Sequence, residues 1–490
     1  MINYNKSFIK NNMYVITSHI LIYAKAIILV PLLIKTIGVA LYGGYILLNT
    51  GIDFLFSISS LGVGFTFKRY LPSEHDRRKQ RELFYHQFTF HFLVIVLFSL
   101  CLLLSADFIK VWFLKNGISF SMPLVCCVLV GTFLFQQSTD FFRYSHRMGL
   151  FSISTILSPY LAIFIIIIIY SLGHLHINTL LKAEITALLC ISIPLCIKIC
   201  TEIGLYIPAL RINKIISDIR LGFPVVLAFS IGYITAVSDK YVIAFFMAPL
   251  YVGYYSPAYT FGSMIMFLPR AIGITLFPLL STATDKQNFD SAKKLVMYSI
   301  KSYLIFAIPF IVGSSILARD ILILFANQEV ADAAFLCVPI VACASLFYGL
   351  STLFTTILYT HLKTKSLFFI NAVSAMLNLI LNIILIYLFK HIIIAALTTL
   401  LSYFVCFILL DREAKMYLEI HYDKAVILKC IGASLLMGVC VCSMKYFCSN
   451  MLLLITVGCF SYFIFLMISG AVSRSEIQYV KNFIYGRLDT

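Results

Sequence analysis

Residues 41–73 read LYGGYILLNTGIDFLFSISSLGVGFTFKRYLPS and decide the fold, because this stretch combines an apolar run, a polar stripe and a basic end. Apolar side chains predominate from Ile46 onward, which predicts a helix that crosses a membrane. The polar exceptions, spaced so that they share one helical face, are Asn49, Asp53, Ser57 and Ser60. Lys68 and Arg69 follow, where a cytoplasmic membrane boundary places cations. The stretch therefore predicts a transmembrane helix with one polar side.

The LYGGY motif of residues 41–45 returns as LYVGY at residues 250–254, and the span after each copy runs to a Pro and a Ser. Six predicted spans separate the copies, so both lie on the same side of the membrane. That arrangement predicts two parallel repeats, as in transporters built from two like halves. The alternative is a chance resemblance of five residues in a Tyr-rich chain.

The composition excludes a soluble globular domain. Of 490 residues 61% are hydrophobic and 12% charged, and the mean hydropathy is +0.97. At about 20 residues per span, the chain has room for about fourteen transmembrane helices. We predict an all-α polytopic membrane protein with two parallel-repeat six-helix bundles and two extra C-terminal helices. The spans are predicted at 13–34, 44–66, 84–105, 120–141, 152–172, 178–199, 219–238, 257–279, 296–317, 335–359, 366–388, 392–410, 425–443 and 451–472.

This division predicts a first bundle over 1–212, a second over 213–412, and two additional helices with a basic cytoplasmic tail over 413–490. The loops alternate in charge: 26 Lys and Arg lie on one predicted side and 7, Lys240 among them, on the other. The positive-inside rule then places both termini in the cytoplasm. The same bias accounts for most of the net charge of +16, so no nucleic-acid partner is expected.

The sequence carries no sign of enzymatic or metal chemistry. The 14 Cys are scattered through apolar segments, no phosphate-binding GxxxxGK[ST] loop occurs, and no His or carboxylate cluster has metal-ligand spacing. The predicted external loops are too short to build an extracytoplasmic catalytic domain. We therefore expect no cofactor, no metal and no enzyme active site, and a functional site that lies among the helices.

Four cations fall inside the predicted spans, namely Lys25, Lys182, Arg270 and Lys301. Each costs about 2.5–3.5 kcal/mol near a bilayer centre, so they are expected to face a cavity rather than lipid. Lys25 and Arg270 lie deepest. Lys182 is close enough to a span end to snorkel, and Lys301 is either a cavity residue or an anchor. A stripe from Ser256 through Ser263 leads to Arg270 and is predicted to share its helical face.

The buried acids and amides have two interpretations each. Asp53 and Asp239 serve either structural salt bridges or ion coupling. Asn378 belongs to a polar line at helical spacing, which either knits helices together or contacts a substrate. That line consists of Asn371, Ser374, Asn378 and Asn382.

The sequence resembles a known family at these points: the early LYGGY turn, the KRYLPS end of residues 68–73, and DKYVIAFFMAPLYVGYYSPAYTF at residues 239–261. Together with fourteen spans in two like halves, they resemble the bacterial O-antigen flippases called Wzx. These belong to the polysaccharide-transporter branch of the multidrug/oligosaccharidyl-lipid/polysaccharide exporter (MOP) superfamily. The resemblance covers nearly the whole chain.

The resemblance implies translocation of an undecaprenyl-diphosphate-linked oligosaccharide from the inner to the outer leaflet of the bacterial inner membrane, by alternating access. It implies a cationic central cavity, to which Lys25 and Arg270 would contribute, and coupling to a proton or sodium gradient, for which Asp53 and Asp239 are candidates. The implied partners are membrane lipids and the polysaccharide polymerase and chain-length machinery.

Three other functions remain open. A drug/cation antiporter of the same superfamily would need buried acids, whereas this chain has more deep Lys and Arg than deep Asp and Glu. A membrane-embedded polysaccharide-processing enzyme would need a large outer loop or a His/acid constellation. A lipid II flippase shares the expected fold and cavity charge.

Overall fold

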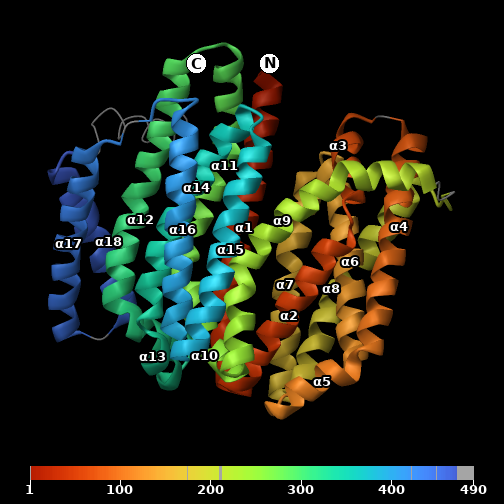
Figure 1. Ribbon diagram of the computed structural model, residues 1–490, viewed down its shortest axis with the longest axis horizontal. Helices are drawn as coiled ribbons and strands as arrows, with labels where there is room; N and C mark the ends of the chain where they lie inside the picture. Colours follow the sequence, from red (N-terminus) through yellow and green to blue (C-terminus); the bar gives the residue numbers. More distant parts are fainter. Residues whose placement is uncertain are drawn as a thin grey trace. The chain divides into compact units, whose positions relative to one another are not determined.

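The computed structural model describes residues 2–74, 76–173, 175–208, 212–420, 422–448 and 450–471, with the backbone alone for 2–16, 19, 20, 23, 73 and 114. Within these ranges the regular structure is entirely helical (Figure 1). The helices are α1 Ile2–Ile37, α2 Val39–Ser59, α3 Val63–Tyr70, η1 Leu71–Ser73, α4 Arg77–Leu104, α5 Ala106–Lys115, α6 Met122–Tyr144, α7 Met148–Ser171, α8 Ile177–Ile203, α9 Ile212–Phe246, α10 Pro249–Gly262, η2 Met264–Met266, α11 Phe267–Asp285, α12 Phe289–Phe325, α13 Gln328–Ala334, α14 Cys337–Thr360, α15 Thr364–Phe389, α16 Ile392–Lys415, α17 Lys424–Phe447 and α18 Met451–Ile468.

In the described part of the chain, 13 helical segments are long and apolar enough to cross a membrane. This confirms the predicted all-α polytopic class and agrees with a count near fourteen. The remaining predicted span, 13–34, falls within α1. The basic tail predicted after the last span, with Arg474, Lys481 and Arg487, lies outside the described residues.

Two predicted spans are not single helices. The span 44–66 breaks between α2 and α3, where Leu61 has φ of 45° and Gly62 has φ of 90°. The span 257–279 breaks between α10 and α11 at the short 3-10 turn η2. Pro269 explains the second break, because it has no N–H to donate to the carbonyl four residues earlier. The stripe from Ser256 to Arg270 therefore does not run along one continuous helical face, and that prediction was wrong.

The described chain folds as two compact units. The first comprises the residues up to Pro257 together with 325–327 and 375–392, and the second comprises 258–324, 328–374 and the residues from Ile393 onward. The predicted division into bundles at residues 212 and 412 stays a prediction.

Within the first unit, α2 lies among α1, α4, α6 and α9. Its start packs against the start of α10 through two glycines, one from each copy of the repeated motif. A Cβ on Gly43 would collide with the carbonyl oxygen of Pro249 and lie 2.7 Å from the amide N of Gly253. A Cβ on Gly253 would collide in turn with the carbonyl oxygen of Val39. The two helix backbones therefore touch, which small residues at a helix crossing permit.

The end of α2 is fixed by a buried hydrogen-bonded histidine. Gln137 Nε2 of α6 lies 2.8 Å from His91 Nδ1 of α4, and His91 Nε2 lies 2.8 Å from Ser59 Oγ. Because the Gln137 amide donates to Nδ1, the neutral ring carries its proton on Nε2 and donates it to Ser59. All three side chains are buried. Residues of α2, α4 and α6 thus form one polar link inside an apolar bundle.

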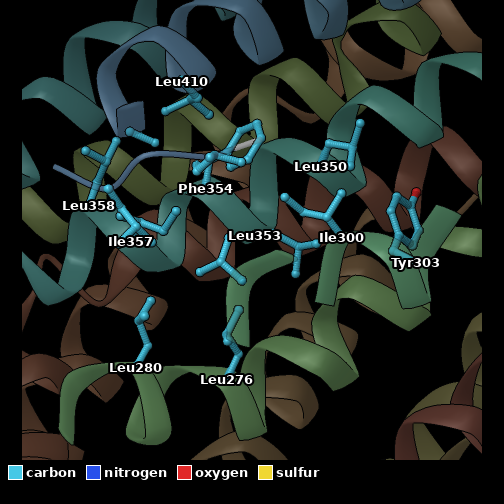
Figure 2. Packing of buried hydrophobic residues seen from close by; sticks show 14 of the residues in the cluster. Leu276, Leu280, Ile300, Tyr303, Leu350, Leu353, Phe354, Ile357, Leu358 and Leu410 are labelled. Atoms are coloured by element: carbon cyan, nitrogen blue, oxygen red, sulfur yellow. The ribbon is translucent and has the colours of Figure 1, made fainter. Parts of the chain in front are cut away.

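The second unit has an apolar core built from α11, α12, α14 and α16. Figure 2 shows its centre, where Leu276 and Leu280 of α11 face Leu353 and Ile357 of α14. Tyr303 of α12 is buried beside this core, and its hydroxyl donates to the carbonyl oxygen of Ser345 at 2.9 Å. Outside this core, α17 and α18 pack side by side (Figure 1). Tyr462 of α18 donates to the carbonyl oxygen of Ile305 on α12 at 2.7 Å.

We expect Gly43→Ala to lower the stability of the protein, because the new Cβ would overlap the α10 backbone, which cannot rotate away as a side chain can. Overpacking of this kind costs about 1–3 kcal/mol. The measurement is the temperature at which half of the detergent-purified protein remains monodisperse. Gly232→Ala on α9 is the matched control, because a Cβ there meets nothing within 4 Å. Equal stability of Gly43→Ala and the control would contradict the close backbone contact.

Candidate functional site

Four charged side chains from four helices of the first unit form a cluster: Lys25 of α1, Asp53 of α2, Glu184 of α8 and Lys240 of α9. Asp53 interacts electrostatically with both lysines, and Glu184 interacts with Lys25 and with Asp53. With all four groups ionised, the two positive and two negative charges cancel. We call these four residues the charged cluster.

The members of the charged cluster differ in exposure. The Asp53 side chain is exposed, while Lys25, Glu184 and Lys240 are half-buried. Behind it, the buried hydroxyl of Tyr45 lies 3.4 Å from Glu184 Oε2 and donates to it. Tyr45 is the last residue of the LYGGY motif, and its hydroxyl also interacts with the side chain of Asn49. The motif therefore packs α2 against α10 through Gly43 and sets a donor against Glu184 through Tyr45.

Two tyrosines of α9 hold the middle of α2 next to Asp53. The Tyr241 hydroxyl donates to the carbonyl oxygen of Leu47 at 2.9 Å and accepts from Thr50 Oγ1 at 3.2 Å. The Tyr233 hydroxyl donates to the carbonyl oxygen of Thr50 at 2.8 Å, and its ring stacks on Phe54 with 5.6 Å between centroids. These contacts fix the helix positions on either side of Asp53 and so fix where its carboxylate lies.

A second polar group surrounds Asp239, which is 1% exposed. The Tyr255 hydroxyl donates to its Oδ2 at 2.7 Å, and the backbone N–H of Lys240 donates to its Oδ1 at 2.8 Å. On the preceding residue, Ser238 Oγ donates to Asn378 Oδ1 of α15 at 3.1 Å, and Asn382 Nδ2 donates to the same oxygen at 3.1 Å. Both carboxylate oxygens of Asp239 thus have a donor.

The other predicted site residues are spread over both units. Ser57 of α2 donates to the carbonyl oxygen of Asp53, four residues earlier in the same helix, at 2.7 Å. Lys182 of α8 is exposed, two residues before Glu184.

In the second unit, Ser263 between α10 and η2 donates to the carbonyl oxygen of Thr260 at 3.2 Å. Arg270 is exposed on α11, and Lys301 is half-buried on α12. The structure thus brings Lys25, Asn49 and Asp53 together, and the cavity role predicted for Arg270, Lys182 and Lys301 stays a prediction.

The sequence interpretation missed Glu184 and ended the span before Lys240. The residues three and four positions away from Glu184 on either side are apolar, so no periodic polar stripe drew attention to it; its only signal is an acid inside the predicted span 178–199. Lys240 was assigned to the outer side because the predicted span ended at residue 238. The helix α9 continues to Phe246 and carries Lys240 in its interior, so the predicted span end at residue 238 was too early; the side of the membrane assigned to Lys240 stays a prediction. Among the residues with described placement, no group of three or more His, Cys, Asp or Glu side chains is arranged to hold a metal ion.

Residues 8–284 match the model of the family described as polysaccharide biosynthesis protein, and residues 224–384 match the MatE model. Two curated proteins of Haloferax volcanii are similar. The probable low-salt glycan biosynthesis flippase Agl15 is 25% identical over 42% of this chain and 43% of its own length. The probable flippase AglR is 28% identical over 34% of each chain. The chain thus spans less than half the length of either relative in these matches.

Solved structures share the fold over a larger part of the chain. The lipid II flippase MurJ in an inward closed conformation superposes with a TM-score of 0.74 at 18% identity, covering 94% of this chain and 99% of MurJ. An inward-facing multidrug resistance MATE family transporter of the MOP superfamily gives 0.63 at 14% identity, over 81% and 94%. These similarities concern the fold alone. The family model covers more than half of the residues, and the chain therefore belongs to the polysaccharide biosynthesis protein family.

Proposed function

We propose that this protein is a flippase that moves an undecaprenyl-diphosphate-linked oligosaccharide, such as an O-antigen repeat unit, from the inner to the outer leaflet of a bacterial inner membrane. Family membership and the flippase names of both Haloferax relatives support this proposal. The observation that carries it is the charged cluster, in which two lysines lie among membrane helices beside the exposed carboxylate of Asp53. The proposed topology keeps both termini in the cytoplasm.

The diphosphate is the part of the cargo that needs fixed positive partners in a site with little water. Lys25 and Lys240 supply two ammonium groups from different helices of one unit. Without cargo, Asp53 and Glu184 balance these charges, since an unpaired cation among apolar helices is costly. Arg270 of the second unit is the further cation that we assign to the diphosphate.

The two acids give the cluster a means of coupling transport to a proton gradient. When the diphosphate lies against Lys25 and Lys240, it brings two negative charges beside two carboxylates. Protonation of Asp53 and Glu184 removes that repulsion and leaves the lysines to the phosphates. Proton release on the other side of the membrane would return the lysines to the carboxylates and expel the cargo. The proposed cycle then moves protons in the same direction as the cargo, so a gradient that is acidic on the cytoplasmic side accelerates export.

The Asp239 group is the alternative place for ion coupling. Its oxygen ligands from Asp239 and Asn378 are of the kind that hard cations such as sodium prefer. Both oxygens of Asp239 accept hydrogen bonds within the protein, however, whereas Asp53 is exposed. We therefore place proton coupling at the charged cluster. The proposal has two further parts. The bundles 1–212 and 213–412 are the two halves that move against each other to alternate access. The protein acts next to the polysaccharide polymerase and the chain-length machinery.

Lys25→Ala and Arg270→Ala are each expected to lower export of the lipid-linked glycan by about 10-fold or more, because each removes a charge-assisted hydrogen bond to the diphosphate. Surface polysaccharide in a complemented deletion strain is the measurement, with the amount of membrane-inserted protein determined in parallel. Lys115→Ala on α5 is the control, because Lys115 is exposed at a helix end away from the cluster. Normal surface polysaccharide in the Lys25→Ala/Arg270→Ala double variant would exclude the diphosphate site.

Glu184→Gln is expected to leave cargo binding intact and to remove most of the acceleration that an imposed pH gradient gives to transport in proteoliposomes. The glutamine keeps the hydrogen bond from Tyr45 but cannot exchange a proton. Glu202→Gln on the same helix is the matched control, because Glu202 pairs with Arg147 outside the cluster. If Glu184→Gln responds to the gradient as the unmodified protein does, while Asp239→Asn loses its response to sodium, coupling belongs to the Asp239 group.

A drug/cation antiporter is the second candidate function. It is favoured by the match to the MatE model and by the exposed carboxylate of Asp53, which a cationic drug would neutralise. The two functions make opposite demands on the cluster. Replacing Lys25 by Ala would weaken binding of a diphosphate and strengthen binding of a cation, so the sign of the change in affinity decides between the two functions.

The relatives named above are flippases and transporters, which fits a protein that is not an enzyme.

A further inference from the structure

A groove in the second unit lies between the start of α12 and the start of α17, and none of its residues belongs to the charged cluster. It has a volume of about 280 Å³. We call it the α12–α17 groove and define it by Lys294, Tyr298, Lys301 and Leu304 of α12 with Tyr422 and Val426. Lys301 was predicted to be either a cavity residue or a membrane anchor, and the groove gives it a specific surrounding.

The groove is positive at its rim and apolar at its floor. Lys294 and Lys301 are seven residues apart on one face of α12, which is about 10 Å along the helix axis. The neighbouring Lys293 is matched by Glu419, 3.5 Å away. Asp423, the acid that lines the groove, caps α17 by accepting from the N–H of Val426 at 3.1 Å. Leu304 and Val426 at the floor are buried.

Tyr422 forms a fixed aromatic wall. Its hydroxyl donates to Asp411 Oδ1 at 2.6 Å, and Lys415 Nζ donates to Asp411 Oδ2 at 2.6 Å while lying 5.1 Å from the centroid of the Tyr422 ring. Burial, followed by the hydrogen bond and the charge of Asp411, raises the pKa of Tyr422 above its usual range. The phenol therefore stays protonated and keeps the wall in place.

The position along α12 matches the level of lipid headgroups. A bilayer core takes about 20 helical residues, and α12 has 37, so its ends extend beyond the core. Lys294 lies in the second turn, before the predicted span 296–317 begins. Lys301 lies two turns further in, inside that span, from where its long side chain can snorkel to the headgroup level. A ligand held there would place its anionic group beside the lysines and its hydrocarbon along the apolar floor.

We propose that the α12–α17 groove binds the phosphate of an anionic glycerophospholipid, held as a resident lipid. Two ammonium groups at headgroup level attract a phosphodiester, and the volume suits a small headgroup rather than an oligosaccharide. Both walls belong to one compact unit, so a movement of the two units against each other would not carry this site from one side of the membrane to the other. The groove is therefore assigned to a bilayer lipid and not to the cargo. This assignment does not rest on the proposed flippase function.

The test is native mass spectrometry of the full-length protein in detergent, titrated with dioleoyl phosphatidylglycerol or dioleoyl phosphatidylcholine. We expect selective retention of phosphatidylglycerol. Lys294→Gln/Lys301→Gln is expected to bind it about 25-fold more weakly, at about fivefold for each lysine. Lys294→Arg/Lys301→Arg keeps both charges and should retain the lipid. Lys293→Gln is the matched control beside the groove and should also retain it.

Competition identifies the source of the phosphate. Inorganic phosphate is expected to leave phosphatidylglycerol bound, because it lacks the hydrocarbon that the floor accommodates. Equal retention of the two lipids, or undiminished binding by the double Gln variant, would overturn the proposal. A third result would also overturn the proposal: undecaprenyl diphosphate displaces phosphatidylglycerol, and the double Gln variant no longer binds undecaprenyl diphosphate. The groove would then be a cargo site, and the proposed flippase function would still stand.

Discussion

The cost of placing a charge among apolar helices is the constraint on which this structure depends. Lys25 and Lys240 lie inside helices of the first unit, and each has a carboxylate within electrostatic reach. An isolated ammonium there would cost several kcal/mol, and an acid on a neighbouring helix offsets that cost. The pairing is adjustable, because a carboxylate becomes neutral when it takes up a proton. A site that balances its own charges can thus exchange one anion for another.

The helix α2 makes most of the contacts that position the charged cluster. Gly43 lets it touch α10, Tyr45 reaches Glu184, and Thr50 is held by tyrosines of α9. At its far end Ser59 joins the buried histidine of α4. Because these contacts occur at intervals along one helix, the position of Asp53 is fixed from both sides. Gly43 and Gly253 are each the fifth residue of their helix, so the two copies of the repeated motif meet in equivalent register.

Much of this was predictable from the sequence, because hydropathy and periodicity identify membrane helices and polar stripes. The all-α class, the approximate number of spans and the presence of Lys25 and Asp53 inside membrane helices followed from those signals. The break after α2 did not, since residues 61–63 remain apolar and only the positive φ angles of Leu61 and Gly62 reveal the bend. Glu184 has no polar neighbour at helical spacing. Lys240 lies in a part of α9 where the hydropathy decreases although the helix continues. Because a periodicity pattern follows one helix at a time, it could not show that Glu184 and Lys240 lie near Lys25 and Asp53 of other helices.

The central claim is that a diphosphate replaces the carboxylates as the partner of the lysines, and that the carboxylates take up protons when it does. The most direct measurement is the pH change on adding farnesyl diphosphate to the purified protein in weakly buffered detergent solution. The account predicts net proton uptake on binding, which Asp53→Asn/Glu184→Gln abolishes without abolishing binding itself. Binding without proton uptake, or equal uptake by the double variant, would contradict it.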